Sequence, residues 1–455
     1  MKYVVVGTSH AGYEAVQTLL KADKDAEIVL FEAGSTASFL SCGIQSYLED
    51  ISKSLDELHY ANEASYKEQG VDLRLNTSVV GIDPEAKEVT TRTADGQESK
   101  ESYDKLLLSP GGKPGTIPGV DDQHENIFYL RGRDWADKVK NRMTEAKKAI
   151  VVGAGYIGIE AAVAYAQAGI EVTLIDFVNS ILPTYLDTEF TDILTKHMTE
   201  KGITIKTGEA VKELQADENN KVTAVVTDRG TYEADTVIIS TGVVPNTEWL
   251  NGILDLDKKG FVQVDEHMQT SVTDVYAAGD ATAIPFAPTN GQAYIALATN
   301  ARRQGTVMAC HASGDTDAKM GRVNGTSGLA VFDYKFATTG IKDANADSYN
   351  GNVQSVYKEE LIRPNFMHDG GEKVMMKLHY DADTGRILGA QIMSTYDILQ
   401  AINAVSVAIE AEWTVDQLAQ ADFFFQPEFD RPWNFLNVLA QEAQGQPYGA
   451  DKMIF

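Results

Sequence analysis

The sequence has few cysteines, a deficit of basic residues and no long apolar run. Cys42 and Cys310 are the only cysteines among 455 residues, which excludes a disulfide framework and indicates a reducing compartment. No segment approaches the roughly 18 consecutive apolar residues of a membrane-spanning helix. The N-terminus enters a strand directly, without the apolar core of a secretory signal. We therefore expect a cytoplasmic protein with no membrane partner.

Basic residues are outnumbered by acidic ones. The chain has 39 lysines and arginines against 66 aspartates and glutamates, which gives a formal charge of −27. This charge argues against nucleic acid or an anionic membrane surface as a partner. Any anionic ligand must instead be held by backbone dipoles and a few well-placed cations. The length predicts two to four domains, at about 100 to 200 residues each.

A strand, a glycine turn and a helix follow one another twice along the chain. Apolar strands are expected at residues 3–6 and 150–152. The turns after them carry Gly7, Ser9 and Gly12 in the first copy and Gly153, Gly155 and Gly158 in the second. Such glycines allow a tight turn, a close approach of backbone N–H groups to a pyrophosphate, and close packing of helix on strand. The pattern predicts two dinucleotide-binding units.

Each unit continues to an acidic residue at the end of its next strand. Glu32 and Asp176 both follow their glycine turns by about 20 residues, the spacing of a carboxylate that binds a ribose. Asp176 is followed by Phe177, Val178 and Asn179, so no arginine is available there for a 2′-phosphate. We therefore expect the second unit to prefer a dinucleotide without a 2′-phosphate, which is NADH rather than NADPH if the ligand is a nicotinamide nucleotide.

Three further apolar runs end in small residues and glycine, at residues 103–112, 234–250 and 273–282. Together with the two glycine turns, their order resembles the FAD-dependent pyridine nucleotide-disulfide oxidoreductase family over essentially the whole chain. The resemblance implies that the first unit binds FAD and the second binds NADH. It also implies that Asp280, in the run Ala-Gly-Asp, contacts the ribityl chain of the flavin.

The resemblance implies an α/β fold with two Rossmann-like dinucleotide-binding domains and a C-terminal α+β dimerisation domain. The expected boundaries are 1–113 together with 244–321 for FAD, 114–243 for NADH, and 322–455 for dimerisation. The last segment itself shows alternating strands, a turn at residues 381–385 and a helical stretch at 398–413, which is typical of an antiparallel sheet with helices. A homodimer or homotetramer is the expected assembly.

Within the family, the stretch "SFLSCGIQSYL" around Cys42 resembles the NADH peroxidase and NADH oxidase branch, which uses one redox-active cysteine. Tyr47 stands where a disulfide reductase would carry a second thiol, and "FFFQPEF" stands where it would carry a His-Pro pair. The branch implies a Cys42 that cycles between thiolate and sulfenic acid. A helix N-terminus and the flavin are expected to lower its thiol pKa. His10 and Arg302 are the other expected catalytic residues.

The resemblance assigns the remaining binding residues. For FAD they are Gly7, Ser9, His10, Ala11, Gly12, Glu32, Ser41, Cys42, Ser109, Pro110, Gly111, Arg131, Asp280, Ala296, Leu297 and Ala298. For NADH they are Gly153, Gly155, Tyr156, Ile157, Gly158, Asp176, Tyr185 and Gly242. The histidines are scattered, and no metal site is expected.

Each assignment has a plainer alternative. A lone cysteine is often an inert apolar side chain, which is our expectation for Cys310. His10 can simply occupy a helix N-terminus, and Tyr156 can be ordinary packing rather than a gate over the flavin. The three phenylalanines at 423–425 are either interior or reach the active site of the other subunit.

Four functions remain open on the sequence. Reduction of hydrogen peroxide by NADH is favoured, and water-forming reduction of oxygen by NADH is its main rival. A coenzyme A disulfide reductase also uses one cysteine, but no basic pocket for a phosphorylated nucleotide tail is evident. A flavoprotein sensor that acts through a partner is the non-enzymatic alternative, which would bind NADH without turnover.

Overall fold

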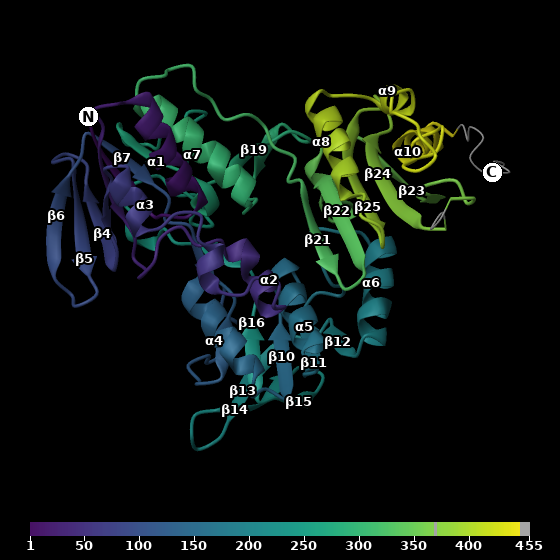
Figure 1. The fold of residues 1–455 in the computed structure, drawn as a ribbon, viewed down its shortest axis with the longest axis horizontal. Coiled ribbons are helices and arrows are strands. Elements are labelled where there is room, and N and C mark those ends of the chain that lie inside the picture. The colour runs from purple at the N-terminus through teal and green to yellow at the C-terminus, as the bar shows by residue number, and fades with distance from the viewer. Residues whose placement is uncertain (368–370, 446–455) are drawn as a thin grey trace.

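The protein is built on three five-stranded sheets that follow one another across the molecule, as a computed structural model describing residues 1–367 and 371–445 shows (Figure 1). Two of the sheets are parallel and the third is antiparallel. Parallel strands alternating with helices, followed by an antiparallel sheet with helices, confirm the predicted α/β fold class. None of the helices in the described residues has the length and apolar character needed to cross a bilayer.

The first sheet has the strand order β18-β7-β1-β2-β3 and is entirely parallel. Its strands are β1 (Lys2–Val6), β2 (Glu27–Phe31), β3 (Asp72–Arg74), β7 (Lys105–Leu108) and β18 (Val275–Ala277). The associated helices are α1 (His10–Ala22), α3 (Glu63–Glu68) and α7 (Ala298–Ala312). The four residues 3–6 and the three residues 106–108 are buried, because both faces of a parallel sheet are covered.

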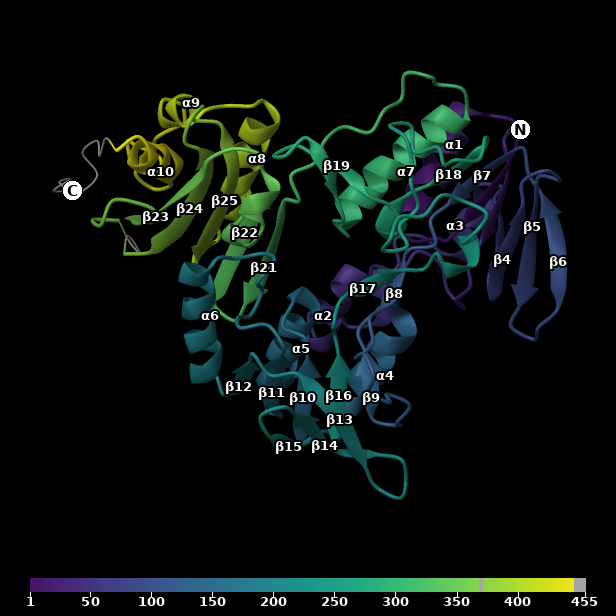
Figure 2. The same ribbon diagram turned by 180° about the vertical axis from the view of Figure 1, so that it is seen from behind.

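Helix α7 comes from far along the chain and packs lengthwise on α1 (Figures 1 and 2). A glycine makes this contact possible, because a Cβ on Gly305 would lie 2.3 Å from the carbonyl oxygen of Ala11. Residues 275–312 thereby join the N-terminal sheet. Next to this sheet lies a small antiparallel one of β4 (Thr77–Asp83), β5 (Glu88–Thr93) and β6 (Glu98–Ser102).

The second sheet has the strand order β12-β11-β10-β16-β9 and is also parallel. Its strands are β9 (Ile127–Tyr129), β10 (Lys148–Val152), β11 (Glu171–Asp176), β12 (Ile203–Thr207) and β16 (Thr236–Ile239). The associated helices are α4 (Arg133–Met143), α5 (Tyr156–Gln167) and α6 (Thr188–Glu200). A three-stranded meander of β13 (Val211–Ala216), β14 (Val222–Thr227) and β15 (Thr231–Glu233) leads from β12 to β16.

The third sheet is antiparallel, with the order β21-β22-β25-β24-β23. Its strands are β21 (Ser327–Val331), β22 (Tyr334–Gly340), β23 (Val353–Leu361), β24 (Lys373–Asp381) and β25 (Ile387–Ser394). The helices α8 (Ile402–Glu410), α9 (Val415–Ala419) and α10 (Phe435–Ala443) cover it. The predicted turn at 381–385 is confirmed between β24 and β25.

Short elements connect these regions. The strand pairs are β8 (Gly112–Pro114) with β17 (Val243–Pro245), and β19 (Ile284–Phe286) with β20 (Gly291–Ala293). Helix α2 (Ile44–Leu48) leaves the first region and lies against α4 and α5 of the second (Figure 1). The short 3-10 helices are η1 (Ser41–Gly43), η2 (Leu55–Leu58), η3 (Glu248–Leu250), η4 (Gly279–Ala281), η5 (Asp343–Ser348) and η6 (Leu399–Ala401).

Candidate active site

The carboxyl ends of the first parallel sheet gather the predicted FAD-binding residues at one edge. Gly7 follows β1, Glu32 follows β2, Ser109 follows β7, and Asp280 comes shortly after β18. This edge is where open parallel sheets bind nucleotides. The Ser109 hydroxyl donates to the carbonyl oxygen of Val6 at 2.7 Å, which fixes β7 against the glycine turn.

The first glycine turn is closed tightly against the sheet. Gly7 has a φ of +90°, which favours glycine, and a Cβ on Gly12 would lie only 1.9 Å from the carbonyl oxygen of Gly7. The Glu32 carboxylate accepts hydrogen bonds from the Thr8 hydroxyl at 2.6 Å, the Thr8 backbone N–H at 3.1 Å and the Gly34 N–H at 2.8 Å. These bonds hold Glu32 at the position expected for a ribose-binding carboxylate.

The second turn repeats this geometry and is open on one side. Gly153 has a φ of +107°, and a Cβ on Gly158 would lie 1.8 Å from the carbonyl oxygen of Gly153. A Cβ on Gly155 or Gly242 would meet no atom within 4 Å, so space remains beside the start of α5. The Asp176 carboxylate accepts from the backbone N–H of Ala154 at 2.6 Å. Backbone amides, free space and a carboxylate together fit a dinucleotide.

Several predicted residues lie at the ends of helices. Ser9 is the N-cap of α1, and His10, Ala11 and Gly12 form its first turn. Leu297 is the N-cap of α7, with Ala296 before it and Ala298 as the first helical residue. Tyr156, Ile157 and Gly158 begin α5. Pro110 and Gly111 follow Ser109 in the loop to β8.

Arg131 and Asp280 form an ion pair, with Nη2 3.0 Å from the carboxylate. Arg131 precedes α4 of the second region and Asp280 lies in η4 of the first. The two predicted FAD residues are therefore brought together across the boundary between the regions. The pair is partly buried, so each charge is partly compensated by the other.

Cys42 lies at the junction between the first two regions, in the short helix η1 just before α2. Gly43 lets this segment approach the η2 helix, because a Cβ there would lie 2.7 Å from Leu58 Cδ2. The cysteine side chain is exposed, and Ser41 precedes it in the same turn. In the part of the chain that is described, Cys42 has no disulfide partner.

The expected low pKa of the Cys42 thiol differs from what the structure gives. Desolvation by the surrounding protein raises this pKa, and the carboxylates of Glu160 and Asp280 raise it further, while Arg131 lowers it. Helix α2 spans five residues, too short for a strong N-terminal dipole. Burial, with Glu49 nearby, likewise raises the pKa of Glu160 to about 7. The protein atoms around Cys42 thus favour its neutral thiol.

His10 and Arg302 contact each other near the starts of α1 and α7. Arg302 Nε lies 3.4 Å from His10 Nδ1, and Nη1 of the same guanidinium pairs with Glu14 at 2.9 Å. The guanidinium also lies over the rings of Tyr13 and Tyr60, at 4.8 and 5.0 Å from their centroids. Burial, followed by the charge of Arg302, lowers the pKa of His10, which keeps its imidazole neutral near pH 7.

Tyr60 was not predicted from the sequence. Its ring stacks on His10 with centroids 5.1 Å apart and an angle of 16° between the planes. Its hydroxyl is buried and has no hydrogen-bond partner of normal geometry within residues 1–367 and 371–445. Burial raises the pKa of Tyr60, so the hydroxyl stays a potential donor. The Ser9 side chain approaches this hydroxyl outside normal hydrogen-bond geometry, and a buried hydroxyl so weakly satisfied beside His10 is typical of a ligand-binding pocket.

Tyr156 stacks on Tyr185, with ring centroids 3.8 Å apart and planes 15° apart. The Tyr156 hydroxyl shares a hydrogen bond of 2.8 Å with that of Ser327 on β21. The second and third regions therefore meet at this ring pair. These two contacts restrict the motion of the Tyr156 side chain more than we would expect for a ring that opens and closes freely over the flavin.

The remaining cysteine and the phenylalanine segment are also placed. Cys310 lies in the last turns of α7 and is half-buried, and its role as a packing residue stays a prediction. Phe423 packs against the core of the third region, whereas Phe424 and Phe425 are exposed at 72% and 48%. The interior alternative therefore applies to Phe423 alone.

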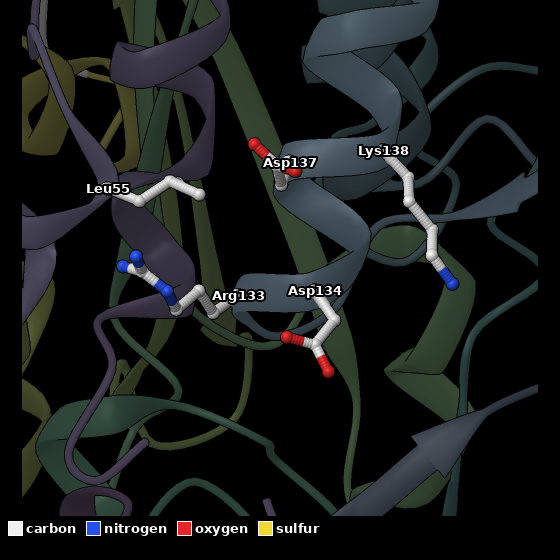
Figure 3. Close-up of a pocket in the computed structure, with 5 residues that line it drawn as sticks. All are labelled: Leu55, Arg133, Asp134, Asp137 and Lys138. Carbon is white, nitrogen blue, oxygen red and sulfur yellow. The ribbon is translucent and has the colours of Figure 1, made fainter. Parts of the chain in front are cut away.

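A surface pocket of about 350 Å³ lies elsewhere, between η2 and the start of α4 (Figure 3). It is lined by Leu55, Arg133, Asp134, Asp137 and Lys138. The side chains that line it come from two helical segments, and none of them is a predicted site residue. Arg133 is paired with Asp56 at 2.9 Å. We do not assign the active site to this pocket.

Comparison with protein families identifies the chain. Residues 1–305 match the pyridine nucleotide-disulphide oxidoreductase family, and residues 326–434 match the dimerisation domain of that family. The chain belongs to this family, as its sequence resemblance implied. It is therefore a flavoprotein oxidoreductase whose cofactors are FAD and a pyridine nucleotide, and the third region is a dimerisation domain.

Individual relatives extend over nearly the entire chain. An NADH oxidase of Enterococcus faecalis is 41% identical over 446 residues, covering 97% of this chain and 99% of the relative. A water-forming NADH oxidase from Lactobacillus brevis, solved bound to NADH, is 37% identical with a TM-score of 0.93 and 98% of each chain covered. An NAD-dependent persulfide reductase from A. fulgidus is 28% identical with a TM-score of 0.93, covering 98% of this chain and 83% of that one.

Proposed function

We propose that the protein is a water-forming NADH oxidase that reduces oxygen through Cys42. The full-length similarity to proteins named NADH oxidase supports this function over peroxide reduction, which the sequence alone favoured. The observation that carries the chemistry is a lone thiol at the junction of the two dinucleotide units, with no second cysteine nearby. A disulfide reductase that works through a pair of thiols would need that second sulfur, whereas a coenzyme A disulfide reductase would not.

The protein provides binding and proton positions around the cofactors. The first glycine turn and Glu32 are proposed to hold FAD, and the second turn with Asp176 is proposed to hold NADH. Held there, FAD would supply the two-electron chemistry that links hydride oxidation of NADH to reduction of oxygen or of an oxidised sulfur. Arg131 and Asp280, paired across the two regions, are proposed to orient the ribityl side of that site.

Cys42 is proposed to complete the reduction to water. Its thiolate attacks one oxygen of hydrogen peroxide, the O–O bond breaks, and the other oxygen leaves as hydroxide, which a proton converts to water. The sulfur keeps one oxygen as sulfenic acid. Two electrons and one proton then return the sulfenic acid to thiolate and release a second water. His10, neutral beside Arg302, is proposed to accept the thiol proton and return it to the departing oxygen.

This cycle also accounts for peroxide reduction as the second candidate function. The step at Cys42 is the same whether peroxide forms at the site from oxygen or enters from solution. The resemblance of "SFLSCGIQSYL" to the peroxidase and oxidase branch is the observation that favours it. The two functions differ in whether oxygen reaches the reduced cofactor.

The stoichiometry of NADH consumption tests the proposal. Under air, a water-forming oxidase consumes two NADH per oxygen and releases no peroxide. An enzyme that consumes NADH only when peroxide is added anaerobically would be a peroxidase, and the oxidase assignment would be wrong. A protein that binds NADH without turnover in either experiment would be a sensor.

The assembly and domain limits are proposed on the same basis. We assign residues 1–113 and 244–321 to the FAD domain, 114–243 to the NADH domain and 322–455 to dimerisation. The exposed aromatic residues Phe424 and Phe429 in the third domain support a homodimer in which this segment meets the partner. A cytoplasmic location is proposed from the scarcity of cysteine.

A further inference from the structure

A buried group of charges joins the start of α6 to the third sheet. Asp187, the N-cap of α6, has a side chain that is 2% exposed. Lys377 and His379 on β24 face it, and their side chains are 3% and 0% exposed. Charged groups this deeply buried are rare unless they are paired.

The contacts within the group are short and numerous. Lys377 Nζ lies 2.6 Å from Asp343, 2.9 Å from Glu189 and 3.3 Å from Asp187. His379 Nε2 lies 2.8 Å from Asp343 and 3.2 Å from Asp187. The same two aspartates therefore hold both basic side chains. We name Asp187, Glu189, Asp343, Lys377 and His379 the junction cluster.

A neutral side chain reinforces the link from the neighbouring strand. The Gln391 amide, on β25, donates to the Asp187 carboxylate at 2.6 Å, and its oxygen accepts the Asp187 backbone N–H at 2.7 Å. The Asp187 carboxylate in turn lies near the backbone N–H of Asp343, which donates to it at 2.9 Å. The first turn of α6 is thus tied to three separate segments of the third domain.

The cluster contains residue types that bind metal ions, but the positively charged Lys377 side chain lies among them. Asp187, Asp343 and His379 place one ligand atom each within 4.8 Å of one another, close enough to share a metal ion. The Lys377 ammonium lies between the same two carboxylates and has the charge that a metal ion would supply. We therefore interpret the cluster as closed by an internal cation.

The junction cluster lies next to the ring pair of the second unit. Asp187 follows Tyr185 by one intervening residue, and Tyr185 stacks on Tyr156. The Tyr156 hydroxyl is bonded to Ser327 of the third domain, and its ring is 5.7 Å from that of Phe336. Both tyrosines are therefore connected to the dimerisation domain, Tyr156 directly and Tyr185 through the cluster.

We propose that the junction cluster is an interdomain lock that holds the Tyr185 segment, and that His379 and Lys377 are positioning residues for the proposed NADH site. The proposal rests on the proposed function insofar as it takes Tyr156 and Tyr185 to border bound NADH. The lock itself requires only the contacts described above.

The charge balance of the cluster makes the lock sensitive to alkaline pH. Three carboxylates face Lys377 and His379, and buried Lys342 lies near Asp187 with its pKa lowered to about 8 by burial. Burial opposes a charged His379, but its hydrogen bonds to Asp187 and Asp343 outweigh this effect and raise its pKa. A histidine whose pKa is raised on folding stabilises the folded protein. This stabilisation is complete at a pH below the pKa of the unfolded state, and it is lost as pH rises through the pKa of the folded state.

The test uses His379→Gln in the FAD-loaded enzyme, because glutamine keeps an N–H donor but loses the charge. The matched control is His197→Gln. His197 lies on α6 and also approaches an aspartate, because its Nε2 is 3.5 Å from the Asp333 carboxylate. Asp343→Asn is a second, milder variant, because the Asp343 side chain is 53% exposed and its loss leaves Asp187 in place. All three are compared with the wild type.

Hydrogen exchange of residues 182–190 and the dissociation constant for NADH are the readouts. We expect exchange there to accelerate at least tenfold in His379→Gln and Asp343→Asn, with NADH binding weakened several-fold and kcat changed less. In the wild type, the same segment should loosen as pH rises above the ordinary histidine range. His197→Gln should match the wild type in both measurements.

Three results would overturn the proposal. Unchanged exchange in His379→Gln would exclude the lock, and faster exchange with unchanged NADH binding would exclude the positioning role. Saturable stabilisation of the wild type by one equivalent of Zn²⁺ would contradict the interpretation that the Lys377 ammonium takes the place of a metal ion. Failure of the proposed function is seen separately, as absence of oxygen and peroxide turnover in the wild type.

Discussion

The guanidinium of Arg302 lies beside the imidazole of His10, with Nε 3.4 Å from Nδ1, although 292 residues separate them in the sequence. Their contact depends on the packing of α7 along α1, which brings both helix starts to the same edge of the first sheet. A positive charge this close disfavours protonation of the imidazole. The proton chemistry proposed for His10 therefore depends on Arg302.

The first prediction concerns the pH dependence of this pair. Arg302→Met should remove the charge that helps to lower the pKa of His10, so the acid limb of the kcat/KM profile for peroxide should move to higher pH. Arg303→Met is the control, because that arginine bonds Asn300 on the same helix and does not contact His10. Equal profiles for Arg302→Met and the wild type would show that the charge of Arg302 does not tune His10.

The second prediction concerns Cys42. In Cys42→Ser, NADH should still be consumed under air, but hydrogen peroxide should accumulate and the ratio should fall from two NADH per oxygen toward one. Anaerobic peroxide reduction should fall by about 10³-fold or more, because the only proposed nucleophile is gone. An oxygen electrode and a peroxide assay measure both effects.

Cys310→Ser is the matched control for that experiment, because it changes the other free thiol, which lies on α7. It should keep the wild-type stoichiometry. Mass spectrometry after excess peroxide without NADH should place added oxygen on Cys42 and not on Cys310. Full peroxide turnover in Cys42→Ser would remove the single-cysteine mechanism.

Local patterns carried most of what the sequence could predict. Each glycine turn, its strand and its acidic residue lie within about 30 residues, the span of one βαβ unit, so spacing alone indicated the two parallel sheets. Glu32 and Asp176 lie where that spacing placed them. The roles of these residues toward FAD and NADH stay predictions, since the structure gives their positions only.

The missed features depend on contacts between distant segments. Tyr60 meets His10 through a loop that pairs with residue 39, and no local pattern distinguishes it from other tyrosines. The junction cluster combines α6, β24 and the start of η5, so its histidine and aspartates looked scattered. The pKa of Cys42 differed from expectation because the surrounding protein desolvates the thiol and, second, because Glu160 reaches it from another domain.

The third prediction concerns nucleotide preference. We predict that the Asp176 carboxylate lies where a 2′-phosphate would bind, so the wild type should have a higher kcat/KM with NADH than with NADPH. Asp176→Ala should narrow this gap on the order of tenfold, equivalent to about 1.4 kcal/mol. Asp192→Ala, which removes an exposed acid from α6, should leave the gap unchanged. A wild type that prefers NADPH would contradict this role of Asp176.

The fourth prediction concerns assembly. Phe424 and Phe429 are 72% and 60% exposed and their rings lie edge to face, 6.4 Å apart. A charge placed in this aromatic pair should destabilise its packing against a partner subunit. Phe424→Asp should therefore shift the molar mass measured by light scattering toward that of the monomer and reduce activity. Phe177→Asp, at a position 75% exposed in the second domain, is the control for the light-scattering measurement. An active wild-type monomer would contradict the proposed dimer.

The fifth prediction concerns the buried hydroxyl of Tyr60. Tyr60→Phe keeps the ring that stacks on His10 and lies under Arg302, and it removes a buried oxygen that Ser9 approaches without a hydrogen bond of normal geometry. The variant should be as stable as the wild type or slightly more so, by up to about 1 kcal/mol. If the hydroxyl donates to peroxide at Cys42, kcat/KM for peroxide should fall about tenfold, while anaerobic reduction of the bound flavin by NADH stays unchanged. Tyr13→Phe, which keeps the other ring beside Arg302, should leave both rates unchanged. If the Tyr60→Phe variant and the wild type reduced peroxide at equal rates, the Tyr60 hydroxyl would have no role in the reaction, and only the ring could contribute.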